Sequence, residues 1–162
     1  MFSIKLVHPQ YFIGGCTFFT DDFDGTDGQY PSALRQDAAG NLYGATLFGG
    51  NSFGYGTVFK ITATGAFSTL YNFCSRSNCT DGFSPENITL DSAGNIYGIA
   101  VGGGSNNDGV FFKLTPSGTE TVLYNFTSIP ASGLVMDKSG NFYGTMSNGN
   151  GGLNGVWKLT KQ

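Results

Sequence analysis

The sequence is poor in charge and has a single histidine, and both shortages narrow what the protein can do. Charged residues make up 12% of the 162 residues, and the net charge is −3. Because the lysines and arginines form no cluster, we expect neither nucleic acid nor an anionic membrane surface as a partner. His8 is the only histidine, so the sequence offers no convincing Ser/His/Asp or Cys/His set. These shortages favour a protein that is not an enzyme.

Long apolar runs and cysteines are also scarce. No run approaches the roughly 20 apolar residues of a membrane-spanning helix. Of the three cysteines, Cys74 and Cys79 have four residues between them, whereas Cys16 stands alone. The close pair lies in a polar loop and predicts a disulfide in an oxidising compartment, with two reduced thiols as the alternative. Since Cys16 and His8 are the only other soft ligands, we expect no zinc site and no other cofactor.

Glycine and aromatic residues, by contrast, are abundant. The chain has 26 glycines, and aromatic residues make up 15% of it. The glycines follow no triplet period, which excludes collagen, and disordered chains are usually poor in aromatics. Glycine and aromatics together suit many short strands joined by frequent turns.

One eight-residue motif occurs three times, and it organises the chain. It reads DAAGNLYG at Asp37–Gly44, DSAGNIYG at Asp91–Gly98 and DKSGNFYG at Asp137–Gly144. Its Asp binds backbone amides, its first Gly supplies a positive φ and its Asn tolerates one, so the motif predicts a β-hairpin turn. The Tyr falls on the second strand, and the last Gly lets another backbone or a neighbouring ring approach closely. The structural residues of the motif are Asp37, Gly40, Asn41, Tyr43, Gly44, Asp91, Gly94, Asn95, Tyr97, Gly98, Asp137, Gly140, Asn141, Tyr143 and Gly144.

The spacing of the motif predicts a repeated unit of four strands. Its Asn occurs at positions 41, 95 and 141, intervals of 54 and 46 residues, a range typical of propellers and solenoids. In the middle unit we expect strands at 85–91, 96–101, 110–115 and 121–126. The predicted fold is all-β, a β-propeller-like array of about three four-stranded antiparallel blades in an incomplete or partly closed ring. A β-sandwich and a β-prism are the alternatives.

We expect a single repeat domain over residues 1–162. Residues 1–30 form an irregular segment, 31–84 blade 1, 85–130 blade 2, and 131–162 a third blade that lacks its own fourth strand. Residues 16–23 precede Pro31 much as residues 70–73 precede Pro85, so an N-terminal strand could close the last blade. Three blades would make a very tight ring. We therefore expect an open fan, a ring completed by self-association or further repeats, or a fragment of a longer array.

Several stretches together resemble a known repeat family. The stretches DAAGNLYGAT, GTVFKIT, STLYNF and a cysteine-pair loop ending in TDGFSP are similar to the GloVer repeat of Gloeobacter and Verrucomicrobia. The resemblance covers residues 27–160. It implies a bacterial, exported, propeller-type repeat protein that is often held at the cell surface by an anchor. The biochemical role of the family is not established, so the resemblance carries over no catalytic residues.

Two groups of residues suggest binding chemistry, and each has a simpler explanation. Asp22, Asp24 and Asp27 could offer oxygens to Ca²⁺, but no bidentate Glu closes the loop, and solvated turn carboxylates are the favoured interpretation. The tyrosines of the motif could stack on carbohydrate, but equivalent aromatics in every blade favour packing between blades. The expected first strands bring no repeated ligand type to the channel mouth; their polar and sulfur-bearing residues include Ser32, Gln36, Asn87, Thr89 and Met136.

The sequence thus predicts a non-enzymatic binding or structural module of unknown ligand, extracellular or on a bacterial cell surface. One alternative is a propeller hydrolase or lyase with its site at the channel mouth. The other is an inactive fragment of a longer propeller array.

Overall fold

The computed structural model of the protein describes residues 9–13, 16–19, 25–146 and 155–160, and these residues form mostly β-strands. A short 3₁₀ turn, η1 (Ser77–Cys79), lies between β6 and β7. The strands are β1 (Pro9–Ile13), β2 (Cys16–Phe19), β3 (Gln29–Gln36), β4 (Leu42–Phe48), β5 (Thr57–Ile61), β6 (Phe67–Asn72), β7 (Phe83–Leu90), β8 (Ile96–Gly102), β9 (Val110–Leu114), β10 (Glu120–Asn125), β11 (Pro130–Met136), β12 (Phe142–Met146) and β13 (Gly155–Leu159).

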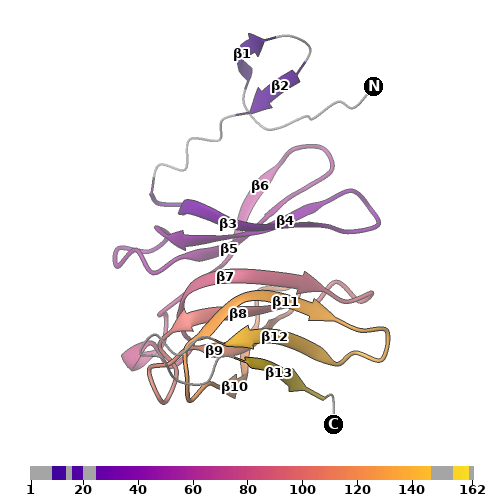
Figure 1. Ribbon diagram of the computed structural model, residues 1–162. Coiled ribbons are helices and arrows are strands. Elements are labelled where there is room, and N and C mark those ends of the chain that lie inside the picture. The colour runs from indigo at the N-terminus through magenta and orange to yellow at the C-terminus, as the bar shows by residue number, and fades with distance from the viewer. Residues whose placement is uncertain (1–8, 14–15, 20–24, 147–154, 161–162) are drawn as a thin grey trace.

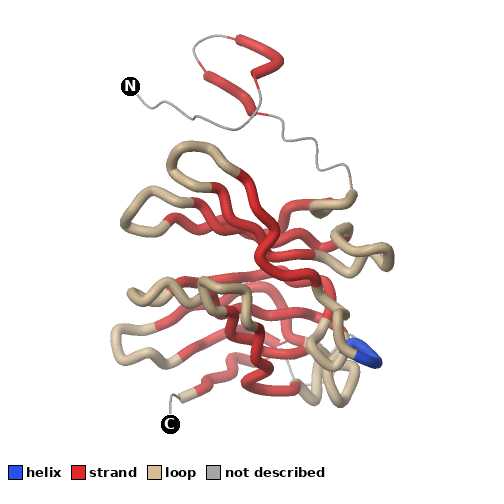
Figure 2. Tube along the Cα trace, turned by 180° about the vertical axis from the view of Figure 1, so that it is seen from behind, coloured by secondary structure: helices blue, strands red, loops and turns tan. Residues whose placement is uncertain are grey.

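The strands form three antiparallel sheets and one separate hairpin (Figure 1). Blade 1 contains β3–β6, blade 2 contains β7–β10 and blade 3 contains β11–β13, each in sequence order across the sheet. The blades stack face on face, with blade 2 in the middle, and most turns lie along the two sides of the stack, where the strands end (Figure 2). The expected all-β, propeller-like array is confirmed, and the strands of the described residues do not close into a ring.

The N-terminal strand pairs differently from the expectation for residues 16–23. Strand β2 pairs with β1 rather than with β13, so blade 3 keeps three strands in the described part of the chain. Residues 20–23 lie outside the described residues. The pairing with β1 is local in sequence, and local contacts cost less loop-closure entropy than distant ones.

The first strand of each blade lies at the inner edge of its sheet and contacts the first strand of the next blade. Strand β7 contacts both β3 and β11, whereas β6 and β10 lie at the opposite edges of their sheets. Each first strand pairs through a proline near its start and has a bulge just after it: Pro31, Pro85 and Pro130. Proline has no N–H to donate, so it suits an edge strand beside a bulge.

Alternation along the strands of blade 2 builds two separate cores. Ile96, Val110 and Phe112 point to one face and pack against blade 1. Ile99 and Phe111 point to the other face and pack against blade 3. Because successive side chains alternate between the two faces, β8 and β9 each contribute to both interfaces. Apolar packing between neighbouring blades therefore holds the array together.

The last glycine of each motif makes room for an aromatic ring of its own blade. A Cβ built on Gly98 would overlap the buried ring of Phe112, which lies opposite on β9. Gly44 lies under Phe59 in the same way, and Gly144 lies under Trp157. The ring can lie flat on the strand only because the glycine has no side chain.

Replacing Gly98 by alanine is expected to destabilise the protein by about 1 to 3 kcal/mol, because Phe112 must leave its packed position. Gly155→Ala is the matched control, since its Cβ would meet only Met146 Cγ, at 3.9 Å. Urea unfolding of both variants measures the difference. Equal midpoints for Gly98→Ala and the wild type would contradict the proposed role of this glycine.

Candidate functional site

The Asp of each motif is the centre of a hydrogen-bonded turn. Asp91 Oδ1 accepts from the backbone N–H groups of Ala93 and Asn95, both at 2.9 Å. Its Oδ2 accepts from Asn95 Nδ2 at 2.8 Å and from the Tyr97 hydroxyl at 3.2 Å. The same four bonds occur around the equivalent carboxylates Asp37 and Asp137. Three separate segments of the sequence thus fold into the same kind of turn.

These bonds stabilise the ionised form of the carboxylates. The side-chain hydrogen bond from Asn141 is the main reason that the pKa of Asp137 falls to about 2. Hydrogen bonding by Asn41 likewise lowers the pKa of Asp37. Burial alone would raise the pKa of Asp91, but the bonds from Asn95 and the other donors together lower it. All three carboxylates are therefore acceptors committed to their turns at neutral pH.

The tyrosine of each motif also has a lysine over its ring. Lys60 Nζ lies 5.4 Å from the centre of Tyr43, and the equivalent pairs are Lys113 with Tyr97 and Lys158 with Tyr143. Tyr43 is only 4% exposed. These rings are held by the Asp at the hydroxyl and by the cation over the face, so they are part of the blade framework.

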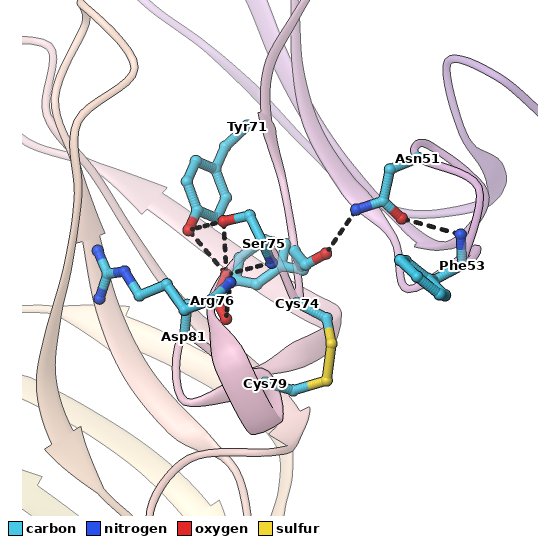
Figure 3. Close-up of a disulfide and its surroundings, with 9 residues drawn as sticks. Asn51, Phe53, Tyr71, Cys74, Ser75, Arg76, Cys79 and Asp81 are labelled. Carbon is cyan, nitrogen blue, oxygen red and sulfur yellow. Dashed lines mark hydrogen bonds between the residues drawn. A yellow bond between two sulfur atoms is a disulfide. The ribbon is translucent and has the colours of Figure 1, made fainter.

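The loop between β6 and β7 carries the disulfide expected from the sequence. Cys74 and Cys79 are bonded to each other, which confirms the predicted pair (Figure 3). Beside the disulfide, the fully buried Asp81 accepts from the Tyr71 hydroxyl at 2.7 Å and from the Ser75 backbone N–H at 2.9 Å. Asp81 thus fixes the loop to β6.

The same loop reaches across to blade 2 through an ion pair. Arg76 Nη2 lies 2.7 Å from Glu120 Oε2 on β10 and donates to the Glu120 backbone carbonyl at 2.9 Å. The Glu120 side chain is fully buried, while the Arg76 side chain is 46% exposed. In Figure 3 the Arg76 guanidinium points away from the disulfide. The inserted loop therefore ties the outer strands of blades 1 and 2 together.

Burial dominates the acid–base behaviour of this cluster. Desolvation raises the pKa of Glu120 to about 7, against the opposing attraction of Arg76 and with the help of the nearby Asp81 charge. Burial and the adjacent Asp81 also raise the pKa of Tyr71. Perturbed acids of this kind gather at functional sites, although structural ion-pair networks shift pKa values too.

Sequence reasoning missed Arg76 and Glu120. Glu120 and Val122 are two residues apart on the alternating strand β10, so their side chains point to the same face. An acidic residue at an inward-facing position was therefore the signal that the sequence offered. Its partner, however, comes from an irregular loop 44 positions earlier. No periodicity in the sequence predicts a contact of that kind.

Two grooves flank Tyr124 at the outer side of the second interface. The larger, of about 600 Å³, has an aromatic floor of Tyr97, Phe111 and Phe142. The smaller, of about 270 Å³, is lined by Trp157 and Tyr124. Both run beside β13, the outermost strand of blade 3.

The remaining candidates from the sequence are scattered. Asp22 and Asp24 lie outside the described residues, and the backbone carbonyl of Asp27 accepts from Thr57 Oγ1 at 3.0 Å. Among the residues that the structure describes, no three His, Cys, Asp or Glu side chains gather as they would around a metal. Ser32 Oγ donates to the Pro85 carbonyl at 2.7 Å, which joins the first strands of blades 1 and 2.

Glu120→Gln is expected to flatten the pH dependence of stability. Because folding raises the pKa of Glu120 from 4.5 to about 7, the folded state binds the proton more tightly, and stability falls as pH rises through this range. Between pH 5 and pH 8 the free energy of unfolding of the wild type should therefore fall by on the order of 2 kcal/mol. The variant should not show this decrease.

Urea unfolding at both pH values measures this difference. Glu86→Gln on β7 is the matched control, since Glu86 forms no ion pair within the described ranges. An unchanged pH slope in Glu120→Gln would refute the assignment.

Comparisons with known proteins agree with the fold. The crystal structure of a protein provisionally assigned as a gluconolactonase aligns with 82% of this chain at 15% identity and a TM-score of 0.53. The chain spans 46% of that structure, less than half its length. No curated protein matches the sequence. In the described part of the chain, no helix is long and apolar enough to cross a membrane. Residues 10–160 match the Gloeobacter/Verrucomicrobia repeat, and the chain belongs to that family.

Proposed function

We propose that this chain is a non-catalytic repeat module that acts outside the cytoplasm, in a binding or structural role. The observation that carries the proposal is that the motif carboxylates are occupied by hydrogen bonds within their own turns. Asp37, Asp91 and Asp137 each accept four hydrogen bonds within their own turn, and none is left to bind a substrate. A polar group whose acceptor sites are filled by the fold contributes to stability and not to chemistry.

The inserted loop supports an oxidising compartment. Its disulfide closes a small loop that carries Arg76 to Glu120, so the bond also positions a contact between blades. Disulfides persist mainly in exported proteins. A location outside the cytoplasm, on a bacterial surface, agrees with this feature.

The loops at the ends of the blades are where we place ligand specificity. In blades 1 and 2 the loop before the third strand is anchored by one asparagine: Asn51 Nδ2 donates to the Phe73 carbonyl and Asn106 Nδ2 to the Phe126 carbonyl. The tips of these loops are exposed, at residues 52–53 in blade 1 and 105–107 in blade 2, and they differ in sequence between the blades. A rigid scaffold with variable loops is a common arrangement for binding.

A lactone hydrolase is the second candidate, because the similar solved structure has been assigned that activity. Glu120 is the acid with the pKa best suited to proton transfer at neutral pH. It lies on β10, however, at the edge of the sheet opposite the inner strand β7, and it is paired with Arg76. Its position fits a bond between blades better than a site at the channel mouth.

Hydrolysis of glucono-1,5-lactone separates the two candidates. We expect the purified protein to leave the rate of acid release at the buffer value, with or without added Ca²⁺, Mg²⁺, Mn²⁺ or Zn²⁺. Titration at constant pH measures the rate, and Glu120→Gln serves as the control variant. Hydrolysis that rises in proportion to protein concentration would overturn the non-catalytic proposal.

A further inference from the structure

We propose that two copies of this chain close one ring by exchanging strands, with β2 of each copy added to the open edge of β13 in the other. The proposal does not depend on whether the module binds a ligand or catalyses a reaction. It follows from three features: two exposed faces, one open strand edge and the register of β2 relative to blade 1.

The first feature is an apolar face on blade 1 that lacks a neighbouring blade. Leu34 on β3 is 52% exposed. Its counterparts, Ile88 on β7 and Leu134 on β11, pair with the equivalent motif glycine and are 0% and 6% exposed. Ile88 is covered by blade 1 and Leu134 by blade 2. The position is therefore built to be covered by a preceding blade.

Blade 3 has the opposite face open. Val156 on β13 is 75% exposed. Its counterparts Val58 and Phe111 are only 0% and 1% exposed, because each packs against the following blade. By analogy with the two interfaces inside the chain, the open face of a blade 3 would cover Leu34, and the open face of a blade 1 would cover Val156. Because the two faces lie at opposite ends of one stack, a second copy can satisfy both at once.

The second feature is the open edge of β13 in the described part of blade 3. In the first interface, β10 of blade 2 lies across from β6 and is tied to its loop through Arg76 and Glu120. In the second interface, blade 3 has no strand beyond β13 among the described residues. Leu123 and Tyr124 of β10 are consequently 48% and 42% exposed, and the two grooves beside β13 flank Tyr124. An unpaired strand edge beside apolar grooves is suited to accept a strand.

The third feature identifies the strand that fits. Strand β2 begins at Cys16, 12 residues before Gly28, just as Leu70 stands 12 residues before Gly82. The glycines are equivalent, since each has a positive φ and stands one residue before the first strand of a blade. By this register, β2 corresponds to residues 70–73 at the end of blade 1. It is the fourth strand of whichever blade precedes blade 1.

In a ring of two copies, the blade that precedes blade 1 is blade 3 of the other copy. The similar solved structure is more than twice as long as the part of it that this chain covers, so two copies match its length. Strand β2 pairs only with β1 in the described part of the chain, and its second edge is available for β13. A hairpin of two strands is only marginally stable alone, so addition to a sheet also stabilises it.

The register predicts which residues meet. In the two complete blades, Tyr71 pairs with Val58 and Tyr124 pairs with Phe111. Thr17 holds the corresponding place on β2, and Val156 the corresponding place on β13. Thr17 of one copy should therefore lie opposite Val156 of the other, at a Cα separation that permits a disulfide.

Cross-linking between differently mutated chains tests the exchange. In a Cys16→Ser background, Thr17→Cys and Val156→Cys are made separately, mixed and oxidised mildly. We expect a covalent dimer whose linked peptides contain residues 17 and 156, formed several-fold faster than with Lys158→Cys, which is out of register. Phe18→Cys with Gly155→Cys is the second in-register pair, should either first variant fold poorly.

Two results would overturn the proposal. The first is a monomer with an internal disulfide when both cysteines are placed in one chain, because it would mean that each chain closes on its own strand. The second is the absence of any cross-link above the Lys158→Cys control for both in-register pairs, because it would mean that β2 does not lie beside β13.

Discussion

An aromatic contact over a motif glycine occurs in each interface between blades. Phe73, just after the last strand of blade 1, packs edge to face on Phe112 of blade 2, with ring centres 5.0 Å apart. Phe126 packs on Trp157 across the second interface in a tilted arrangement, with ring centres 5.5 Å apart. The receiving ring can lie flat because the motif glycine beneath it has no side chain. Two glycines and four rings therefore set the distance between neighbouring blades.

This constraint explains how much of the fold could be predicted from the sequence. The turn chemistry of Asp91 and Asn95 and the alternation on β9 are local, and each occurs in every copy. Strand existence, order and approximate bounds follow from such signals. The pairing of β2 with β1 and the ion pair of Arg76 with Glu120 depend on contacts that occur once, so no repeat marks them.

The two interfaces are built from equivalent residues but are not equally closed. The inserted loop adds a disulfide, the buried Asp81 and the Arg76–Glu120 pair to the first interface. The shorter connection after β10 carries none of these, and Tyr124 is exposed where its counterpart Tyr71 is held by Asp81. Because the Arg76 contact and the Asp81 hydrogen bond need particular partners at particular positions, the insertion fixes blade 1 to blade 2 more specifically than apolar packing alone.

The central claim is that the blades of one chain are part of a ring and that both open faces are covered by a second copy. Light scattering during size-exclusion chromatography tests it directly. The account predicts a discrete species of about twice the 17.1 kDa mass of one chain, without larger assemblies. A single species at 17.1 kDa over a wide concentration range would contradict it, since both faces would then remain open to water.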